Sequence, residues 1–415
     1  MKRIIDKNLF FVKNKDFHTI VIRVVFPMYE LENDLANSIL FSPLVSFMNE
    51  AYDTEDKFYR EKQKNYILNT NVTRNIVGNN AFVSYNMIIP DVDSLKVDYL
   101  DEQFELFEKM IYHPKIIDGG FDEFEFERER KDLKQRIANG MKNLQVYHSV
   151  KLMEHIDTIG VIGRSISNHQ WLIDEATRYN VYEYYKNNIL NNSPIVFVFG
   201  NFDEEKIKLL CKKYLLKDET ISYDEDYNHF LEPRDEVQVI NEKSNFKDSI
   251  LSLVYKVKNM TEDDFAKLSL VSGLLSSSSS RLLMKKLRDE EEIVYSAGSG
   301  AILRAGTLII DCFINKNNND LAYSKVIEVM ESLKDSEFIK PFLENIVERS
   351  RLNQLRLLDD KLSLLDDVVV KELGIDITSQ EKHELIKMIT SEEISEFVDR
   401  LVLDTVYFLE EEEHE

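Results

Sequence analysis

The sequence contains little cysteine, little glycine and no long apolar run, and each shortage excludes a class of protein. Its 415 residues include two cysteines, Cys211 and Cys312, which lie far apart and form no metal or redox motif; we expect unpaired, buried thiols. The 12 glycines form no phosphate-binding loop. No apolar run approaches the roughly 18 residues that span a bilayer, and the N-terminus lacks the apolar core of a signal peptide. We therefore expect a cytoplasmic protein with no membrane association.

Basic residues are also outnumbered. The chain has 52 lysines and arginines against 75 aspartates and glutamates, which gives a formal net charge of −23. A protein that binds nucleic acid needs a basic face, so we exclude nucleic acid as a partner. The acidic balance would suit basic peptide substrates or a basic partner subunit, although plain solubility is the simpler explanation.

What the sequence does contain is a repeated pattern. Alternating apolar residues predict a strand at residues 19–27, followed by a helix at residues 35–48. The same strand and helix recur at residues 248–257 and 265–275, about 230 residues later in both cases. Both halves then close with a helix that leads into an apolar strand. These closing elements are predicted at residues 174–187 and 195–200, and at residues 391–401 and 405–409.

The repeat predicts an α+β protein of two tandem homologous domains, each with a mixed or antiparallel sheet flanked by helices. We place the first domain at residues 1–216 and the second at residues 237–415. The polar, acidic segment 217–236 between them is expected to be a linker. Further elements predicted for the first domain are strands at residues 67–77 and 80–89 and helices at residues 92–112 and 121–141.

Two segments of the chain carry a family resemblance. The run SSRLLMKKLRDEEEIVYS, residues 279–296, fixes Arg288 and Tyr295 at defined spacings from a Ser-Ser-Arg-Leu start. In the first half, IGRSI at residues 162–166 is followed by a helix and by FVFGNFD at residues 197–203. In this order the segments resemble the pitrilysin/insulinase-type metallopeptidases, particularly the short two-domain members such as the mitochondrial processing peptidase subunits and their bacterial relatives. The resemblance implies two similar domains that form half of a clam-shell chamber.

The resemblance also implies a zinc site, and the sequence lacks its ligands. The family carries an inverted motif, His-x-x-Glu-His, on a first-domain helix, where two imidazoles hold zinc and the glutamate activates the bound water. No such motif occurs here, and the matching helix at residues 35–48 has no histidine, aspartate or glutamate. In the later helix that supplies a further glutamate ligand, the frame from Glu129 places Arg136, a cation, at the ligand position. We therefore expect this chain to hold no zinc.

The histidines form no replacement site by spacing. His148 and His155, the latter next to Glu154, stand seven residues apart on a predicted helix, and two turns, about 10 Å of rise, separate them. They are poorly placed to share a metal, so we expect an ordinary exposed helix face. Spacing shows no Ser-His-Asp or Cys-His constellation. The other histidines are scattered along the chain: His18, His113, His169, His229, His383 and His414.

The arginine and tyrosine of the family pattern are nevertheless present. By the resemblance, Arg288 and Tyr295 hydrogen-bond the substrate backbone near the scissile bond and stabilise its developing negative charge. The plain structural alternative is an arginine that caps a helix end and a tyrosine half-buried at the start of a strand.

A chain that keeps this pair without the zinc ligands implies a division of labour. The hypothesis is a zinc-less subunit, with no catalytic residue of its own, that forms a heterodimer with a zinc-bearing paralogue and cleaves peptides. The peptide substrate would bind extended against a sheet edge. One alternative is a catalytically inactive peptide-binding or scaffolding protein in peptide maturation, working as a homodimer. Another is an active enzyme with an unfamiliar metal site.

Overall fold

The structure, a computed structural model, describes residues 2–5, 7–29, 31–47, 49–91, 98–158, 160–217, 219–277 and 280–411. The start of the helix expected at residues 92–112 and the first residue of the motif at 279–296 lie outside these residues. By its internal contacts the chain divides into two units. The first comprises Met1–Gly140 and Ser165–Tyr227, and the second comprises Met141–Arg164 and Asn228–Glu415.

These units differ in one segment from the continuous domains expected from the sequence. Met141–Arg164 precedes part of the first unit in the chain, yet its contacts are with the second unit. Within the segment expected to be a linker, Ile221–Asp224 form strand β9, which pairs antiparallel with β1, Lys2–Ile5. Part of that segment is therefore strand rather than irregular chain.

The first unit is built on a five-stranded sheet with the strand order β2-β8-β3-β5-β4. Strands β2 and β8 run parallel, and the other neighbouring strands run antiparallel. β5 lies between β3 and β4 and is buried along most of its length, whereas β4 forms an edge of the sheet. The strands are β2 (Leu9–Lys13), β3 (Thr19–Tyr29), β4 (Asn69–Val77), β5 (Asn80–Pro90) and β8 (Ile195–Gly200).

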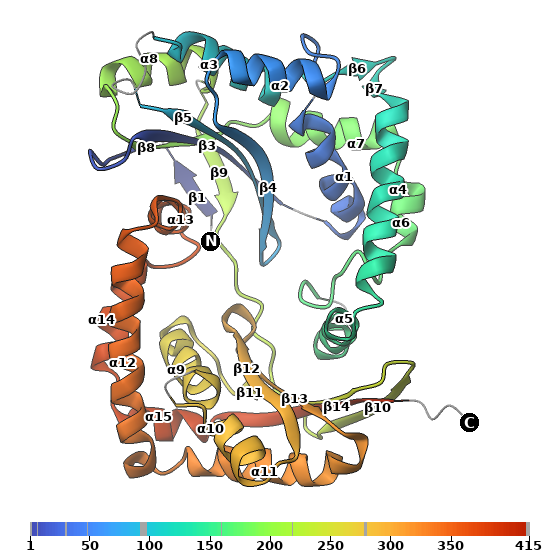
Figure 1. The fold of residues 1–415 in the computed structure, drawn as a ribbon, viewed down its shortest axis with the longest axis vertical. Helices are drawn as coiled ribbons and strands as arrows, with labels where there is room; N and C mark the ends of the chain where they lie inside the picture. The colour runs from blue at the N-terminus through green and yellow to red at the C-terminus, as the bar shows by residue number, and fades with distance from the viewer. Residues whose placement is uncertain are drawn as a thin grey trace. The chain divides into compact units, whose positions relative to one another are not determined.

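Helices pack against one face of this sheet (Figure 1). The ring of Phe26 in β3 lies 6.3 Å from that of Tyr112 in α3, so alternate β3 residues, including Phe26, face the helices. The helix expected at residues 174–187 is divided in two, because Thr177 and Asn180 form a capping box that starts α7 anew. The helices are η1 (Glu32–Asp34), α1 (Leu35–Ser46), α2 (Glu55–Lys64), α3 (Leu100–Tyr112), α4 (Glu123–Gly140), α6 (Trp171–Glu175), α7 (Arg178–Tyr185), η3 (Lys186–Leu190) and α8 (Glu204–Tyr214).

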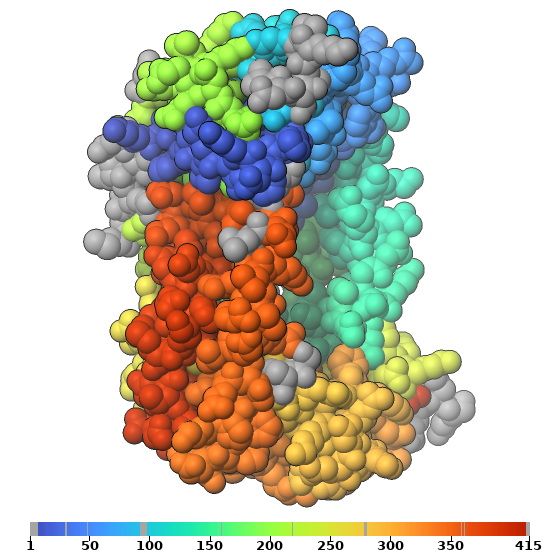
Figure 2. Space-filling model, turned by 60° about the vertical axis from the view of Figure 1, so that its left-hand side comes forward, coloured from blue at the N-terminus to red at the C-terminus, as the bar shows by residue number. Residues whose placement is uncertain are grey.

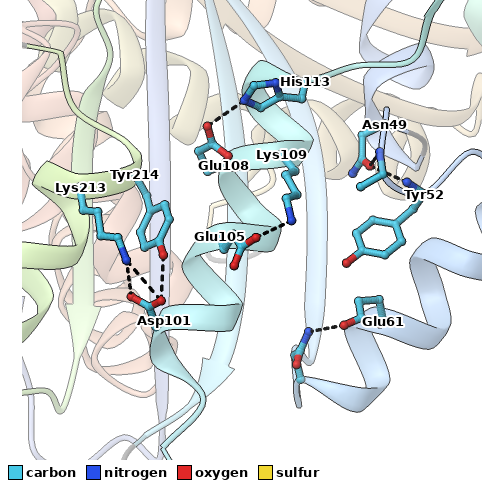
Figure 3. A network of polar contacts seen from close by, with 12 residues as sticks. Asn49, Tyr52, Glu61, Asp101, Glu105, Glu108, Lys109, His113, Lys213 and Tyr214 are labelled. Carbon is cyan, nitrogen blue, oxygen red and sulfur yellow. Dashed lines mark hydrogen bonds and ion pairs between the residues drawn. The ribbon is translucent and has the colours of Figure 1, made fainter.

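Polar contacts at the surface tie α3 to α8 (Figure 3). The carboxylate of Asp101 in α3 accepts hydrogen bonds from Lys213 Nζ at 2.9 Å and from the Tyr214 hydroxyl at 2.9 Å. The bond from Lys213 holds the pKa of Asp101 below its usual range. Near the other end of α3, Glu108 lies 2.9 Å from Nε2 of His113. Exposed contacts of this kind position a helix while adding little stability.

The second unit repeats the sheet strand for strand. Its order is β10-β14-β11-β13-β12, with β10 and β14 parallel and the other neighbouring strands antiparallel. After β11, η4 (Glu262–Asp264) and α9 (Phe265–Ser276) follow as η1 and α1 follow β3. The predicted α+β fold with two repeated sheets is confirmed. The strands are β10 (Gln238–Ser244), β11 (Ser249–Val257), β12 (Val294–Ile302), β13 (Thr307–Ile314) and β14 (Leu401–Glu411).

The two faces of the second sheet are covered differently. Leu251 and Leu253 of β11 point into a core shared with α9, α11 and α12. In Figure 2 the residues of α12 and of the helices that follow it appear as an orange-to-red surface. The opposite face carries α5 (Leu144–Ile156), whose Leu152 packs with Val254 and Tyr407. The remaining helices are α10 (Leu282–Met284), η5 (Lys285–Glu290), η6 (Leu303–Ala305), η7 (Lys316–Asn318), α11 (Asn319–Ser332), α12 (Ser336–Leu358), α13 (Lys361–Glu372), α14 (Ser379–Met388) and α15 (Ser391–Val398).

The two cysteines are buried and unpaired, as the sequence predicts. Burial raises the pKa of the Cys211 and Cys312 thiols to about 12, so both stay protonated at neutral pH. Of the helices that the structure describes, none has the length and apolar character needed to cross a membrane.

Candidate functional site

Arg288 lies near the end of a widened helical turn. Helix α10 continues directly into η5, a π-helical turn in which Leu287 is buried and Arg288 is exposed. The backbone then turns at Glu292, which has a φ of 56° and donates its N–H to the carbonyl of Arg288 at 3.2 Å. Such turns are frequent at functional sites. The local hydrogen bonding therefore holds the backbone of Arg288 while its side chain remains in solvent.

Tyr295 occupies a β-bulge in an edge strand. Among the strands that the structure describes, β12 pairs only with β13, and its register shifts between Val294 and Ser296, leaving Tyr295 as the extra residue. The side chain of Tyr295 is 61% exposed. Bulges at sheet edges re-aim a side chain. Because η5 contacts β12, the structure brings Arg288 and Tyr295 to the same junction between a helical turn and a strand.

Neither of these side chains has a partner within the described part of the chain. The structure shows no hydrogen bond or ion pair for the guanidinium of Arg288 or for the hydroxyl of Tyr295. Nearby Lys286, by contrast, lies 3.4 Å from Glu290 and 3.5 Å from Glu291. The tyrosine is exposed rather than half-buried, unlike the plain structural alternative. A guanidinium and a phenol that are free in this way can donate hydrogen bonds to the carbonyl oxygens of a peptide.

Helix α1 does not suit a metal. It contains no histidine, cysteine, aspartate or glutamate, and most of its residues are buried. Ser38 is fully buried, and its hydroxyl bonds the backbone carbonyl three residues earlier at 3.0 Å. Phe41 is fully buried, with its ring 5.6 Å from Tyr184 and 6.2 Å from Tyr185. Helix α1 therefore presents buried serine and aromatic side chains and none of the nitrogen, thiolate or carboxylate ligands that zinc requires.

Helix α4 carries the second departure from the family pattern. It packs against α1, with Leu133 and Ile137 buried and Arg136 exposed between them. A guanidinium near a divalent cation would repel it rather than bind it. The residues present on α1 and α4 therefore do not fit zinc. Throughout the described ranges, no group of three or more histidine, cysteine, aspartate or glutamate side chains could hold a metal ion.

His148 does not lie on an exposed helix face, contrary to the expectation. It is 4% exposed, with Nε2 at 2.7 Å from the hydroxyl of Ser252, which in turn donates to Asp311 Oδ1 at 2.5 Å. Burial lowers the pKa of His148, while the charge of Asp311 acts in the opposite direction. Ser252 is fully buried and lies between the other two, so the cluster lacks the serine–histidine–aspartate order of a hydrolase triad. Spacing could not reveal it, because α5, β11 and β13 each supply one member.

Comparison with known proteins finds similar sequences and similar folds. Residues 175–349 match the model of the peptidase M16 inactive domain. Over 336 residues the chain is 22% identical to "Probable inactive metalloprotease YmfF" of Bacillus subtilis, covering 80% of this chain and 79% of that protein. The structure of a conserved protein from Enterococcus faecalis superposes with a TM-score of 0.89 at 20% identity, over 100% of this chain and 99% of that one. The structure of a peptidase M16 inactive domain from Pseudomonas fluorescens superposes with a TM-score of 0.73 at 11% identity, over 100% of this chain and 98% of that one.

Proposed function

We propose that this chain, which is similar to the peptidase M16 inactive domain over residues 175–349 and lacks the zinc motif, is the zinc-less subunit of a two-subunit metallopeptidase. In this arrangement a zinc-bearing paralogue holds the metal, and this chain supplies Arg288 and Tyr295 to the peptide substrate. One observation carries the proposal: both side chains are exposed and without partners in the described residues, at the junction of η5 and β12.

Each member of the pair contributes donors to the peptide backbone. The guanidinium of Arg288 presents a fork of N–H groups, and the hydroxyl of Tyr295 adds one O–H. Donors that are already in place where negative charge develops stabilise the transition state more than the ground state. The free edge of β12 supports the same function, because its outward N–H and C=O groups can pair with an extended peptide.

The test is reconstitution of the two subunits. Mixed with a paralogue that carries His-x-x-Glu-His, the wild-type chain should give peptidase activity that neither chain shows alone. Arg288→Ala and Tyr295→Phe should each lower the turnover by about 10²–10³-fold, the range for loss of one such donor. Lys285→Ala, an exposed change on the same turn, should leave the turnover unchanged. Co-purification shows that each variant still assembles, and full activity of the Arg288→Ala, Tyr295→Phe double variant would sink the proposal.

A second candidate is a catalytically inactive protein that binds peptides or acts as a scaffold, in a homodimer. The name of the Bacillus subtilis relative, a probable inactive metalloprotease, favours it. This candidate predicts peptide binding that depends on Arg288 and Tyr295, with no cleavage whichever chain is added. Fluorescence anisotropy with labelled peptides, followed by mass spectrometry of the same samples, separates binding without cleavage from cleavage.

A further inference from the structure

A small groove lies on the face of the second sheet that α5 partly covers. Its volume is about 240 Å³. Pockets for drug-sized ligands measure about 300–1,000 Å³, so this one is better matched to a single side chain. The side chains and backbone that line it include His148, Met153, Gly300, Ile302, Ile309 and Asp311.

The floor of the groove is open because β12 carries glycine there. Gly300 lines the groove, and Gly298, two residues earlier in the strand, faces the same side of the sheet. A Cβ added at either position would meet no atom within 4 Å, and neither residue has a positive φ. Packing and backbone geometry would thus accept a side chain at both. Glycine at these positions leaves room for another backbone to approach the edge strand closely.

One wall of the groove carries the carboxylate of Asp311. Asp311 pairs with Gly298 in the sheet register, and its side chain is 40% exposed. Its Oδ1 accepts the hydrogen bond from Ser252, and His148 Nε2 lies 4.0 Å away. Burial lowers the pKa of His148 below its ordinary value of about 6.5, so this imidazole is neutral at pH 7. Among the described residues no lysine or arginine forms an ion pair with Asp311.

We propose that this groove is a specificity pocket for a basic side chain, lysine or arginine, of a peptide that lies along β12. The inference deepens the proposed function and rests on it. The carboxylate of Asp311 selects the positive charge, and the apolar side chains of Met153 and Ile309 contact the methylene stem. Gly298 stands three residues after Tyr295, about 10 Å along a strand. The basic residue is therefore about three positions from the one held at Tyr295.

Binding of matched peptides to the purified full chain tests the pocket. The probe is a fluorescein-labelled, eight-residue polar peptide with one central arginine, compared with the same peptide carrying norleucine there. Wild type should bind the arginine peptide about tenfold more tightly than the norleucine peptide. An effect of this size lies between those of exposed and of buried charge pairs. Asp311→Asn should abolish that preference and leave the affinity for the norleucine peptide unchanged. Asp320→Asn makes the same charge change on α11, against the other face, and should keep the preference.

Each remaining outcome overturns a defined part of the inference. Equal affinity of wild type for both peptides overturns the specificity pocket and leaves peptide binding standing. A preference that survives in Asp311→Asn shows that the overall negative charge, not this pocket, reads the arginine. If neither peptide binds, both the pocket and the peptide-binding role are overturned. Failure of the proposed subunit function is observed separately, as absence of peptidase activity on reconstitution.

Gly300→Val tests the floor of the groove independently of charge. Valine suits a strand and meets open space here, so thermal unfolding should occur at the same temperature or higher. Both peptides should bind at least about tenfold more weakly, because the side chain fills the space that the peptide occupies. Unchanged affinity in the folded variant would contradict a peptide bound along β12.

Discussion

The two sheets share one strand order but differ in one row of residues that crosses neighbouring strands. In each sheet this row lies on the face opposite the main layer of helices. In the first sheet this row runs inward from the edge through Asn71, Asn86 and Arg23. In the second sheet it runs through Gly298, Asp311 and Ser252. The charge in the row is positive in one unit and negative in the other, and the edge residue carries a side chain in only one of them.

The difference shows what an identical topology leaves undecided. Arg23 donates from Nε to Asn86 at 2.7 Å, so the first row supplies a partner for its own charged side chain. Asp311 accepts a hydrogen bond from Ser252 and lines the groove, and no lysine or arginine in the described part of the chain pairs with it. The first edge carries the side chain of Asn71 in this row, whereas the second edge has a glycine there. A candidate site therefore has to be argued from these side chains and not from the shared fold.

Removing a buried charge from the second sheet should have the largest effect. Strand β8 of the first sheet is apolar throughout, but its counterpart β14 carries Asp404, fully buried between Lys256, at 3.2 Å, and Arg234. Asp404→Asn leaves two cations without a counter-charge and should lower the free energy of unfolding by about 3–5 kcal/mol. Urea unfolding measures this loss. Asp399→Asn, an exposed change, should stay within about 0.5 kcal/mol, and a similar small value for Asp404→Asn would refute the role of the buried cluster.

Much of the fold could be predicted from the sequence because the repeat marks it twice. The alternating strands at residues 19–27 and 248–257 match β3 and β11, and the helices that follow match α1 and α9. The position of α5 could not be predicted. Its contacts with the second sheet join residues far apart in the chain, such as His148 and Ser252, 104 positions apart. Local pattern carries no information about such a contact.

The candidate site was predictable only in part. Arg288 and Tyr295 were found by family resemblance, and their role stays a prediction. The bulge at Tyr295 and the π-helical turn before it could not be predicted from the apolar periodicity. Each changes the backbone geometry locally while the pattern of apolar residues around it stays ordinary. Asp311 gave no signal either, because an aspartate in an alternating strand is typical of any solvent-facing position.

Acidification should have a smaller effect, a loss of stability that arises from His148 in the second unit. His148 is neutral in the folded protein because burial lowers its pKa, with Asp311 and Glu242 as the carboxylates that oppose this shift. Below about pH 6.5 the unfolded chain binds the extra proton first, so stability is full above that pH and falls as the pH drops toward the folded-state pKa.

Urea unfolding at pH 5, 6 and 7 measures this fall. His148→Gln keeps a hydrogen-bond donor but cannot titrate, so it should flatten the loss of stability between pH 7 and pH 5. His113→Gln in the first unit, where the imidazole is exposed beside Glu108, should leave the slope as in wild type. Equal slopes for His148→Gln and wild type would assign the acid sensitivity to other groups.

The smallest expected effect is also the sharpest test of the open edge. Gly298 has no positive φ, and a Cβ added there would meet open space. Gly298→Ala should therefore raise the free energy of unfolding by about 0.4–1 kcal/mol, because alanine lowers the conformational entropy of the unfolded chain. At the first edge, Asn71→Ala should change stability by less than about 0.5 kcal/mol. Thermal unfolding of both variants gives the comparison. If only Gly298→Ala raises the stability, glycine at the second edge costs stability and keeps the edge open. A strand that binds a peptide needs such an open edge. A loss there would show instead that the fold itself needs the glycine, and the open edge would no longer argue for a binding site.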